Sequence, residues 1–417
     1  MRKYLIIILT AFAVSCAKEG RDIAGEPECR VNAIVNGFFS PGQGESTRSS
    51  IAIEDGKFVF KWSEGDCFGI FPNTGQHQQL RVKVSVSDIG ETAFNSSLVG
   101  WNLNTNPSLK IRYAAYRPFV ADYSKSPENI YCNYDGQTQN GNGKEDTNLA
   151  HLGAFDYMAT EPIWIGNGIK ASGSDTEATF KFNHISSLVR LRILAEADGE
   201  YSKMELSTTD GSRIFPQSSL LSLFKEPQIV AKKDELSDSF AVGLKNFSVQ
   251  KYGYMNIWML TPPFSTEGKT LSIKLTGTNG TPDFTCEIPG RALKAGERYS
   301  LNAPDYAIIY KAGEGVFSGE RKEIIEKAFD QEGSHTFDLT EDIPQLENYE
   351  LIGWTDEQGS TEVKYSPDGT LTLLSDKPVT ILYAVYSHVI SGIIINAGSA
   401  EQGVDNYDFT EDDQIWK

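Results

Sequence analysis

The sequence predicts a mainly β protein, and three observations lead to this fold class. Short runs rich in Val, Ile, Phe, Tyr and Thr recur between clusters of Gly, Asn, Asp and Pro, which is typical of strands joined by turns. Several runs alternate apolar and polar residues, as residues 189–193 do, and this favours a strand with one face in a core. Sustained helical periodicity is absent from residues 50–304. Because 417 residues allow two or three domains, we expect tandem β-sandwiches at residues 50–196 and 197–304.

The strands expected in these two domains form two groups on either side of residue 197. The first group is Lys57–Trp62, Leu80–Val86, Leu109–Tyr116, Thr179–Phe182 and Leu188–Leu194. The second group is Tyr201–Leu206, Tyr254–Leu260, Thr270–Leu275 and Arg298–Leu301. Turn residues bound each run, so short connections between the strands are expected.

The pattern changes after residue 304 and predicts a small α+β module at residues 305–387. A helix is expected from Glu320 to Phe329, because its apolar residues would share one side. The strands expected around this helix are Ala307–Tyr310, Tyr349–Trp354, Leu371–Leu374 and Thr380–Tyr386. One helix against a small mixed sheet is an α+β arrangement. A tail at residues 388–417 follows, with an apolar run from Val389 to Ile395 and an acidic end.

The N-terminus predicts an exported protein with a lipid anchor. A positively charged start precedes an apolar run from Tyr4 to Val14, which is too short to span a bilayer and is typical of a signal peptide at residues 1–15. Small residues then lead to Cys16, as in lipoproteins that are cut before a lipid-carrying cysteine. Several acyl chains on one cysteine hold a soluble domain to a membrane. We expect outer-membrane lipid as a partner through Cys16, with residues 16–49 as a polar tether or cleavable leader.

The net charge argues against a nucleic acid partner, and the spacing of the cysteines argues against a metal site. Lys and Arg number 38 against 56 Asp and Glu, a formal net charge of −18, and no basic stripe with aromatics counters it, so no nucleic acid partner is expected. The other cysteines, which have no CxxC or paired spacing and predict no metal site, are Cys29, Cys67, Cys132 and Cys286. They are either buried free thiols or, because export leads to oxidising conditions, partners in a disulfide that the sequence does not identify.

The sequence predicts no catalytic site and no cofactor. The five histidines, none of which has the HxxEH or HxH spacing of metal ligands, are His77, His151, His184, His335 and His388. We expect His184 to bind a backbone group. A GxSxG elbow and a Gly-rich phosphate loop are absent, and acidic residues such as Asp342 and Asp356 are too numerous to single out as an acid–base pair. The chain is therefore expected not to be an enzyme.

Two acidic segments leave a choice between cation binding and solvation. The segment from Asn133 to Asp146 is rich in oxygen ligands and glycines, but it fails the calcium-loop consensus, which favours a solvated loop. The acidic end from Asp408 to Asp413 also fails this consensus, and a solvated segment is expected there too.

Residues 58–71, FVFKWSEGDCFGIF, resemble the fimbrillin-like lipoproteins of Bacteroidales, whose first domain shows a strand, Trp, a polar pair, Gly-Asp and a second strand. Gly65-Asp66 also suits a tight turn on physical grounds. Further motifs follow in the family's order: HL at 151–152, FDYM at 155–158, FKFNH at 180–184, LTPP at 260–263 and LKAGERY at 293–299. The resemblance covers roughly residues 40–303. It implies transthyretin-like sandwiches, other fimbrial subunits as partners and a location in a fimbrium or on the cell surface.

Residues 349–356 (YELIGWTD), Tyr365 with Gly369, and residues 380–386 (TILYAVY) resemble the Listeria-Bacteroides repeat, a small β-grasp unit of bacterial surface proteins. The final Trp usual in that repeat is Tyr386 here. We expect Gly353 to let the backbone bend and Trp354 to pack in the core.

Arg48 and Ser49 end the leader and are candidates for proteolytic maturation. In fimbrillins, cleavage after an arginine at this place removes the leading strand of the first domain. Carried over, a cut after Arg48 would release the lipid anchor and leave a groove that accepts a strand from another subunit. The alternative is an exposed linker that any trypsin-like protease can cut.

These observations predict a non-enzymatic cell-surface lipoprotein, either a fimbrillin-like tip or accessory subunit of a pilus or an adhesin, whose further partner is a surface protein or glycan. The third module favours a tip or anchored role, because stalk subunits of this kind end with their donor strand. The alternative is a glycan-binding outer-membrane lipoprotein in which Trp101, Tyr113 or Trp164 stacks on sugars.

Overall fold

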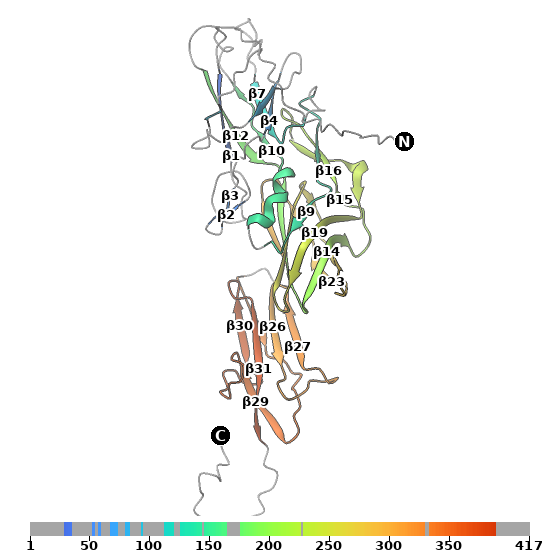
Figure 1. Ribbon diagram of the computed structural model, residues 1–417, viewed down its shortest axis with the longest axis vertical. Helices are drawn as coiled ribbons and strands as arrows, with labels where there is room; N and C mark the ends of the chain where they lie inside the picture. Colours follow the sequence, from blue (N-terminus) through green and yellow to red (C-terminus); the bar gives the residue numbers. More distant parts are fainter. Residues whose placement is uncertain are drawn as a thin grey trace, which may run out of the picture.

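The computed structural model is nearly all β, which confirms the predicted fold class (Figure 1). It describes residues 29–35, 52–54, 57–59, 67–73, 80–83, 93–94, 112–120, 126–143, 146–164, 176–226, 228–329 and 333–388. The helices within these ranges are two short 3₁₀ helices, η3 (Asp146–Ala154) and η4 (Lys233–Glu235). In the described part of the chain, no helix has the length and apolar character needed to cross a membrane.

The first sheet is built from the N-terminal part of the chain in the order β5-β4-β7-β10-β12-β1-β6, and β11 pairs with β7. Its strands are β1 (Cys29–Val35), β4 (Cys67–Pro72), β5 (Leu80–Lys83), β6 (Ala93–Phe94), β7 (Arg112–Arg117), β10 (Met158–Thr160), β11 (Ile163–Trp164) and β12 (Thr176–His184). Phe68 of β4 and Phe182 of β12 are fully buried, and their rings meet edge to face at 5.4 Å. β1 lies within the segment expected to be a polar leader.

A sandwich of two sheets follows. The three-stranded sheet has the order β20-β13-β25, and the five-stranded sheet has the order β23-β22-β14-β19-β9. Their strands are β9 (Thr138–Asn140), β13 (Ser187–Leu194), β14 (Gly199–Thr208), β19 (Ser239–Val249), β20 (Tyr254–Thr261), β22 (Thr270–Gly277), β23 (Phe284–Pro289) and β25 (Arg298–Ala303). Val189 of β13 and Phe240 of β19 line the same apolar interior between the two sheets.

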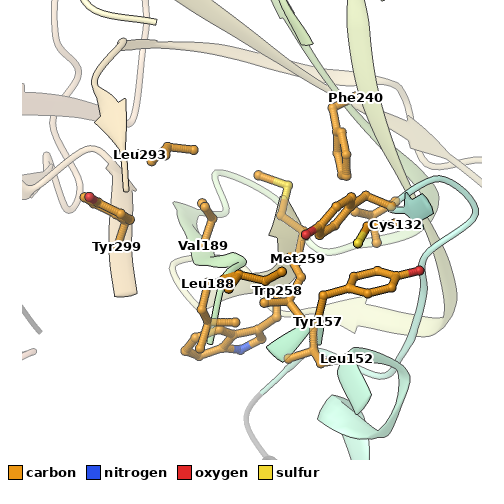
Figure 2. Packing of buried hydrophobic residues seen from close by; sticks show 14 of the residues in the cluster. Cys132, Leu152, Tyr157, Leu188, Val189, Phe240, Trp258, Met259, Leu293 and Tyr299 are labelled. Carbon is orange, nitrogen blue, oxygen red and sulfur yellow. The ribbon is translucent and has the colours of Figure 1, made fainter. Parts of the chain in front are cut away.

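Strand pairing continues across residue 197, where the sequence predicts a domain boundary. β13 ends before residue 197 but pairs with β20 and β25. Figure 2 shows Cys132 and Tyr157 in the same buried cluster as Met259. The smaller pairings are β2 (Ala52–Glu54) with β3 (Lys57–Val59), β16 (Ser218–Leu221) with β8 (Ile130–Asn133) and β17 (Ile229–Ala231), β15 (Phe215–Pro216) with β18 (Leu236–Ser237), and β21 (Phe264–Ser265) with β24 (Ala292–Leu293). One core therefore spans both halves, and the domain limits stay predictions.

The C-terminal module has a separate core. It contains a sheet in the order β27-β26-β31-β29 and a two-stranded sheet of β28 and β30. The strands are β26 (Tyr306–Lys311), β27 (Glu323–Ala328), β28 (Ser334–Asp338), β29 (Tyr349–Thr355), β30 (Thr370–Leu374) and β31 (Val379–His388). Trp354 is fully buried, with its ring 5.0 Å from the ring of Tyr310, so its predicted core position is confirmed.

The helix predicted from Glu320 to Phe329 is wrong. This segment contains β27, which pairs antiparallel with the whole length of β26. Neighbouring Ile324 and Ile325 are both partly buried, whereas Phe329 is 48% exposed, so the apolar residues do not share one buried side. Pairing with β26 satisfies the backbone of these β-branched residues, and this tertiary contact outweighs the local helical pattern.

Gly353 meets its prediction of a bend, because β29 has a bulge between Leu351 and Gly353. A Cβ atom at Gly353 would lie 2.4 Å from Cγ1 of Val363 and 2.6 Å from the backbone oxygen of Tyr365. Only glycine therefore fits at this close approach of two backbones.

Charged side chains join the module to the preceding sandwich. Glu323 of β27 forms ion pairs with Lys251 and with Lys311. Tyr252 donates a hydrogen bond to Glu323 and accepts one from Lys311. We call these four residues the junction cluster. It attaches the flank of the module to the turn between β19 and β20.

Candidate functional site: the sheet of the leading strand

β1 is held inside the first sheet by backbone pairing on both sides. Its seven residues run parallel to β12, from the pair Cys29 and Thr176 to the pair Val35 and Phe182. On the other side, β1 pairs antiparallel with β6. The segment before Arg48 thus supplies an internal strand of the sheet.

Most of β12 depends on β1 for pairing. β10 pairs with β12 at Phe182, Asn183 and His184. Among the described residues, no strand other than β1 pairs with the stretch from Thr176 to Lys181. Loss of β1 would therefore expose a row of backbone donors and acceptors, which is a template for another strand.

The sequence-predicted site residues Cys16, Arg48 and Ser49 lie outside the described residues, as does the apolar run from Val389 to Ile395. Their order along the chain is still informative. β1 ends at Val35 and β2 begins at Ala52, so a cut after Arg48 would separate β1 covalently from every other strand of the first sheet.

The edge of β20 is closed in a different way, by the side chains of neutral residues. Gln137 exchanges two hydrogen bonds with the backbone of Leu260, at 2.7 and 2.9 Å. Gln139 donates to the oxygen of Asn256 and accepts from the N–H of Trp258, both at 2.8 Å. These amides repeat the donor and acceptor pattern of a neighbouring strand.

Asn142 and His151 extend this row of side chains. Asn142 donates to the oxygen of Tyr254 and accepts from the N–H of Asn256, and His151 Nε2 lies 3.0 Å from the oxygen of Trp258. We call Gln137, Gln139, Asn142 and His151 the amide cap. It leaves no room for a strand at this edge.

The prediction of a solvated loop from Asn133 to Asp146 is therefore wrong in part. The segment contains β9, and Gln137 and Gln139 are 1% and 0% exposed. Their alternation places both amides against β20 while the backbone of β9 pairs with β19. Gln137 and Gln139 satisfy backbone groups of β20, whereas Asn133, Asp135 and Asn140 are exposed, as expected for a solvated loop.

His184 Nδ1 lies 2.8 Å from Asp156 Oδ1, a side-chain contact in addition to the backbone partner expected from the sequence, which stays a prediction. Both side chains are buried, at 1% and 0% exposure. This pair lies at the end of β12, directly beyond the stretch that depends on β1. The sequence shows His184 and Asp156 but contains no signal of their contact.

The described residues hold no group of three or more His, Cys, Asp or Glu that could bind a metal ion. Asp342 and Asp356 form separate ion pairs with Arg321 and Lys364 and do not face each other as an acid–base pair would. No arrangement for catalysis appears in this part of the chain.

The cysteines and aromatic candidates are also placed. Cys132 and Cys286 are free thiols, and burial raises the pKa of Cys286 to about 12. Tyr113 is 2% exposed and cannot stack on a sugar. Trp101 and the side chain of Trp164 lie outside the described structure.

No protein-family model and no curated protein matches the chain. Among solved structures it is similar to a candidate cell adhesion protein from Bacteroides ovatus, with 12% identity, a TM-score of 0.44 and coverage of 73% of this chain and 96% of that chain. For a candidate cell adhesion protein from Bacteroides uniformis, the identity is 12% and the TM-score is 0.39, with coverage of 73% of this chain and 99% of that chain. For a fimbrial protein from Bacteroides ovatus, the identity is 13% and the TM-score is 0.26, with coverage of 67% of this chain and 49% of that chain. At this level of similarity, the function of those proteins does not transfer to this chain.

Proposed function

We propose that the chain is a fimbrillin-like surface lipoprotein that assembles by strand exchange. Cys16 carries the lipid that holds the precursor to the outer membrane. A cut after Arg48 releases the anchor and β1 together, and a strand from another subunit then pairs with β12. The protein is not an enzyme in this proposal; its partners are other subunits and a surface protein or glycan.

The observation that carries the proposal is the position of β1. It precedes Arg48 in the chain, yet it is an internal strand of the first sheet and pairs with β12 along seven residues. A tether that served only as a linker would have no need of such pairing. A leader that is exchanged requires it, because the incoming strand replaces the same backbone hydrogen bonds.

The two ends of the molecule support head-to-tail assembly. Figure 1 shows β1 and β12 in the upper part of the molecule and β29 and β31 in the lower part. β31 begins beside Ala307 and ends at His388, which pairs with Tyr349. The run from Val389 to Ile395 follows β31 in the sequence and is the proposed donor. The C-terminal module, a Listeria-Bacteroides repeat in this proposal, places the end of β31 away from β12.

The test is replacement of Arg48 in cells that form fibres. We expect wild-type protein shed from the cells to begin at Ser49 and to form oligomers in electron micrographs. Arg48→Gln should keep the lipid and stay monomeric, whereas Ser50→Ala, a matched change next to the cut, should behave as wild type. Assembly of Arg48→Gln at the wild-type level would overturn the proposal. Cleavage without oligomers would leave Arg48 in an ordinary linker.

A further inference from the structure

Two arginines lie side by side on the outer face of the three-stranded sheet. The residues of β13 that flank them are fully buried toward the core, so Arg190 and Arg192 project from the opposite face. By register, Arg190 lies between Trp258 of β20 and Ser300 of β25, and Arg192 lies beside Asn302 of β25. Both arginines are partly exposed.

Neutral groups hold both guanidinium groups in place. The Cζ atom of Arg192 lies 3.6 Å from the centre of the Tyr254 ring, and that of Arg190 lies 5.5 Å from the centre of the Trp258 ring, which are cation–π distances. Arg190 also donates from Nε and Nη2 to Ser300 Oγ, at 3.2 and 3.0 Å. These contacts fix the positions of the two charges without neutralising them.

The two arginines have no acidic partner among the described residues, although ion pairs to lysine or arginine are frequent elsewhere in this acidic chain. Burial, and then the charges of Arg192 and Arg298, lower the pKa of Arg190 to about 10. A partly desolvated cation without a counter-ion is unfavourable. An anion bound between the two side chains would remove this cost.

A buried hydroxyl beside the arginines is also unused. Tyr254 Oη is buried and makes no hydrogen bond within the described part of the chain, although a phenol can donate and accept one. Burial raises the pKa of Tyr254, so the group stays protonated. Asp305, whose charge also raises this pKa, accepts a hydrogen bond from Asn302 at 2.7 Å.

We propose that this face binds the carboxylate of an acidic sugar. The guanidinium groups of Arg190 and Arg192 bind the carboxylate. The amide of Asn302, which gives one of its two protons to Asp305, donates the other to a sugar hydroxyl. A net charge of −18 repels long polyanions such as nucleic acids, which favours an isolated carboxylate between neutral polar groups. This site is independent of strand exchange and of the aromatic stacking expected from the sequence.

The experiment measures binding of the full chain to a tetrasaccharide of alternating glucuronic acid and N-acetylglucosamine by titration calorimetry. The control ligand is the same tetrasaccharide with its carboxylates reduced to alcohols. We expect the acidic form to bind at least tenfold more tightly, and Arg192→Gln to remove this preference. Arg192 is the better target because its side chain packs on the ring of Tyr254 and makes no hydrogen bond to a described residue. Arg213→Gln, which changes an exposed arginine elsewhere in the sandwich, should leave binding unchanged.

Several outcomes would overturn this inference. Equal binding of the acidic and reduced sugars, or no binding of either, would exclude a carboxylate site. An equal loss in Arg192→Gln and Arg213→Gln would indicate a general charge effect. Displacement of the sugar by an acidic peptide or an oligonucleotide at lower concentration would assign the arginines to that other class of ligand.

Discussion

Two strand edges in this molecule are closed by opposite means. The edge of β12 is covered by β1, a main-chain strand that a single cut would detach, whereas the edge of β20 is covered by the amide cap, which belongs to loops and strands after residue 126. A strand can leave and be replaced by another strand of suitable sequence. Side-chain amides from within the folded core cannot leave in this way. The edge of β12 is therefore suited to strand exchange, whereas the edge of β20 stays closed.

The largest expected effect is loss of β1. A chain that begins at Ser49 should lose on the order of 5 kcal/mol of stability in the first sheet, at about 1 kcal/mol for each backbone hydrogen bond. Hydrogen exchange should show loss of protection from Thr176 to Lys181, with β20 unaffected. A peptide of residues 29–35 added to this chain should restore protection, whereas a scrambled peptide should not. Unchanged protection of residues 176–181 in the chain without β1 would show that the edge of β12 does not depend on β1.

The second effect concerns the amide cap. Gln139→Leu keeps the volume of the side chain but leaves the oxygen of Asn256 and the N–H of Trp258 buried and without partners. We expect a loss of about 2–6 kcal/mol in urea unfolding, since each of the two unsatisfied groups costs about 1–3 kcal/mol. The opened edge should also promote association at high concentration. The control Ser202→Ala removes a hydroxyl from an exposed position and should change stability by less than about 0.5 kcal/mol.

The strand pattern could be predicted from the sequence wherever an element has its own periodicity. β13 and β20 fall where alternating or continuous apolar runs predicted them, because burial on one or both faces leaves its trace in the residues themselves. β27 was mistaken for a helix, since two neighbouring isoleucines fit either period and only pairing with β26 decides between them.

The candidate site shows the limit of such predictions more clearly. Arg48 is visible as a basic residue in a polar leader, but nothing in residues 29–35 states that they pair with residues 176–182. Gln137 and Gln139 read as polar loop residues because sequence gives no sign of the backbone edge that they satisfy. Contacts between distant segments, such as His184 with Asp156, depend on topology and not on local composition.

The smallest expected effect is the response of the junction cluster to acid, compared with that of the amide cap. Burial opposes ionisation of Glu323, but hydrogen bonds from Lys251, Lys311 and Tyr252 outweigh it and lower its pKa from 4.5 to about 2. Since the folded pKa lies below the unfolded one, the junction cluster should contribute fully above about pH 4.5. Its contribution of about 1–3 kcal/mol should be lost as the pH falls toward 2.

The amides of Gln137, Gln139 and Asn142 do not titrate, so their part of the amide cap should hold through the same range. Hydrogen exchange between pH 6 and pH 3 should therefore show loosening of β26 and β27 relative to β20, after correction for the intrinsic rate. Glu323→Gln should loosen the junction already at pH 6 and make it insensitive to pH, whereas Glu357→Gln, at an exposed position in the same module, should keep the wild-type profile. Equal loosening of β20 would mean that acid acts on the whole fold and not on the junction cluster.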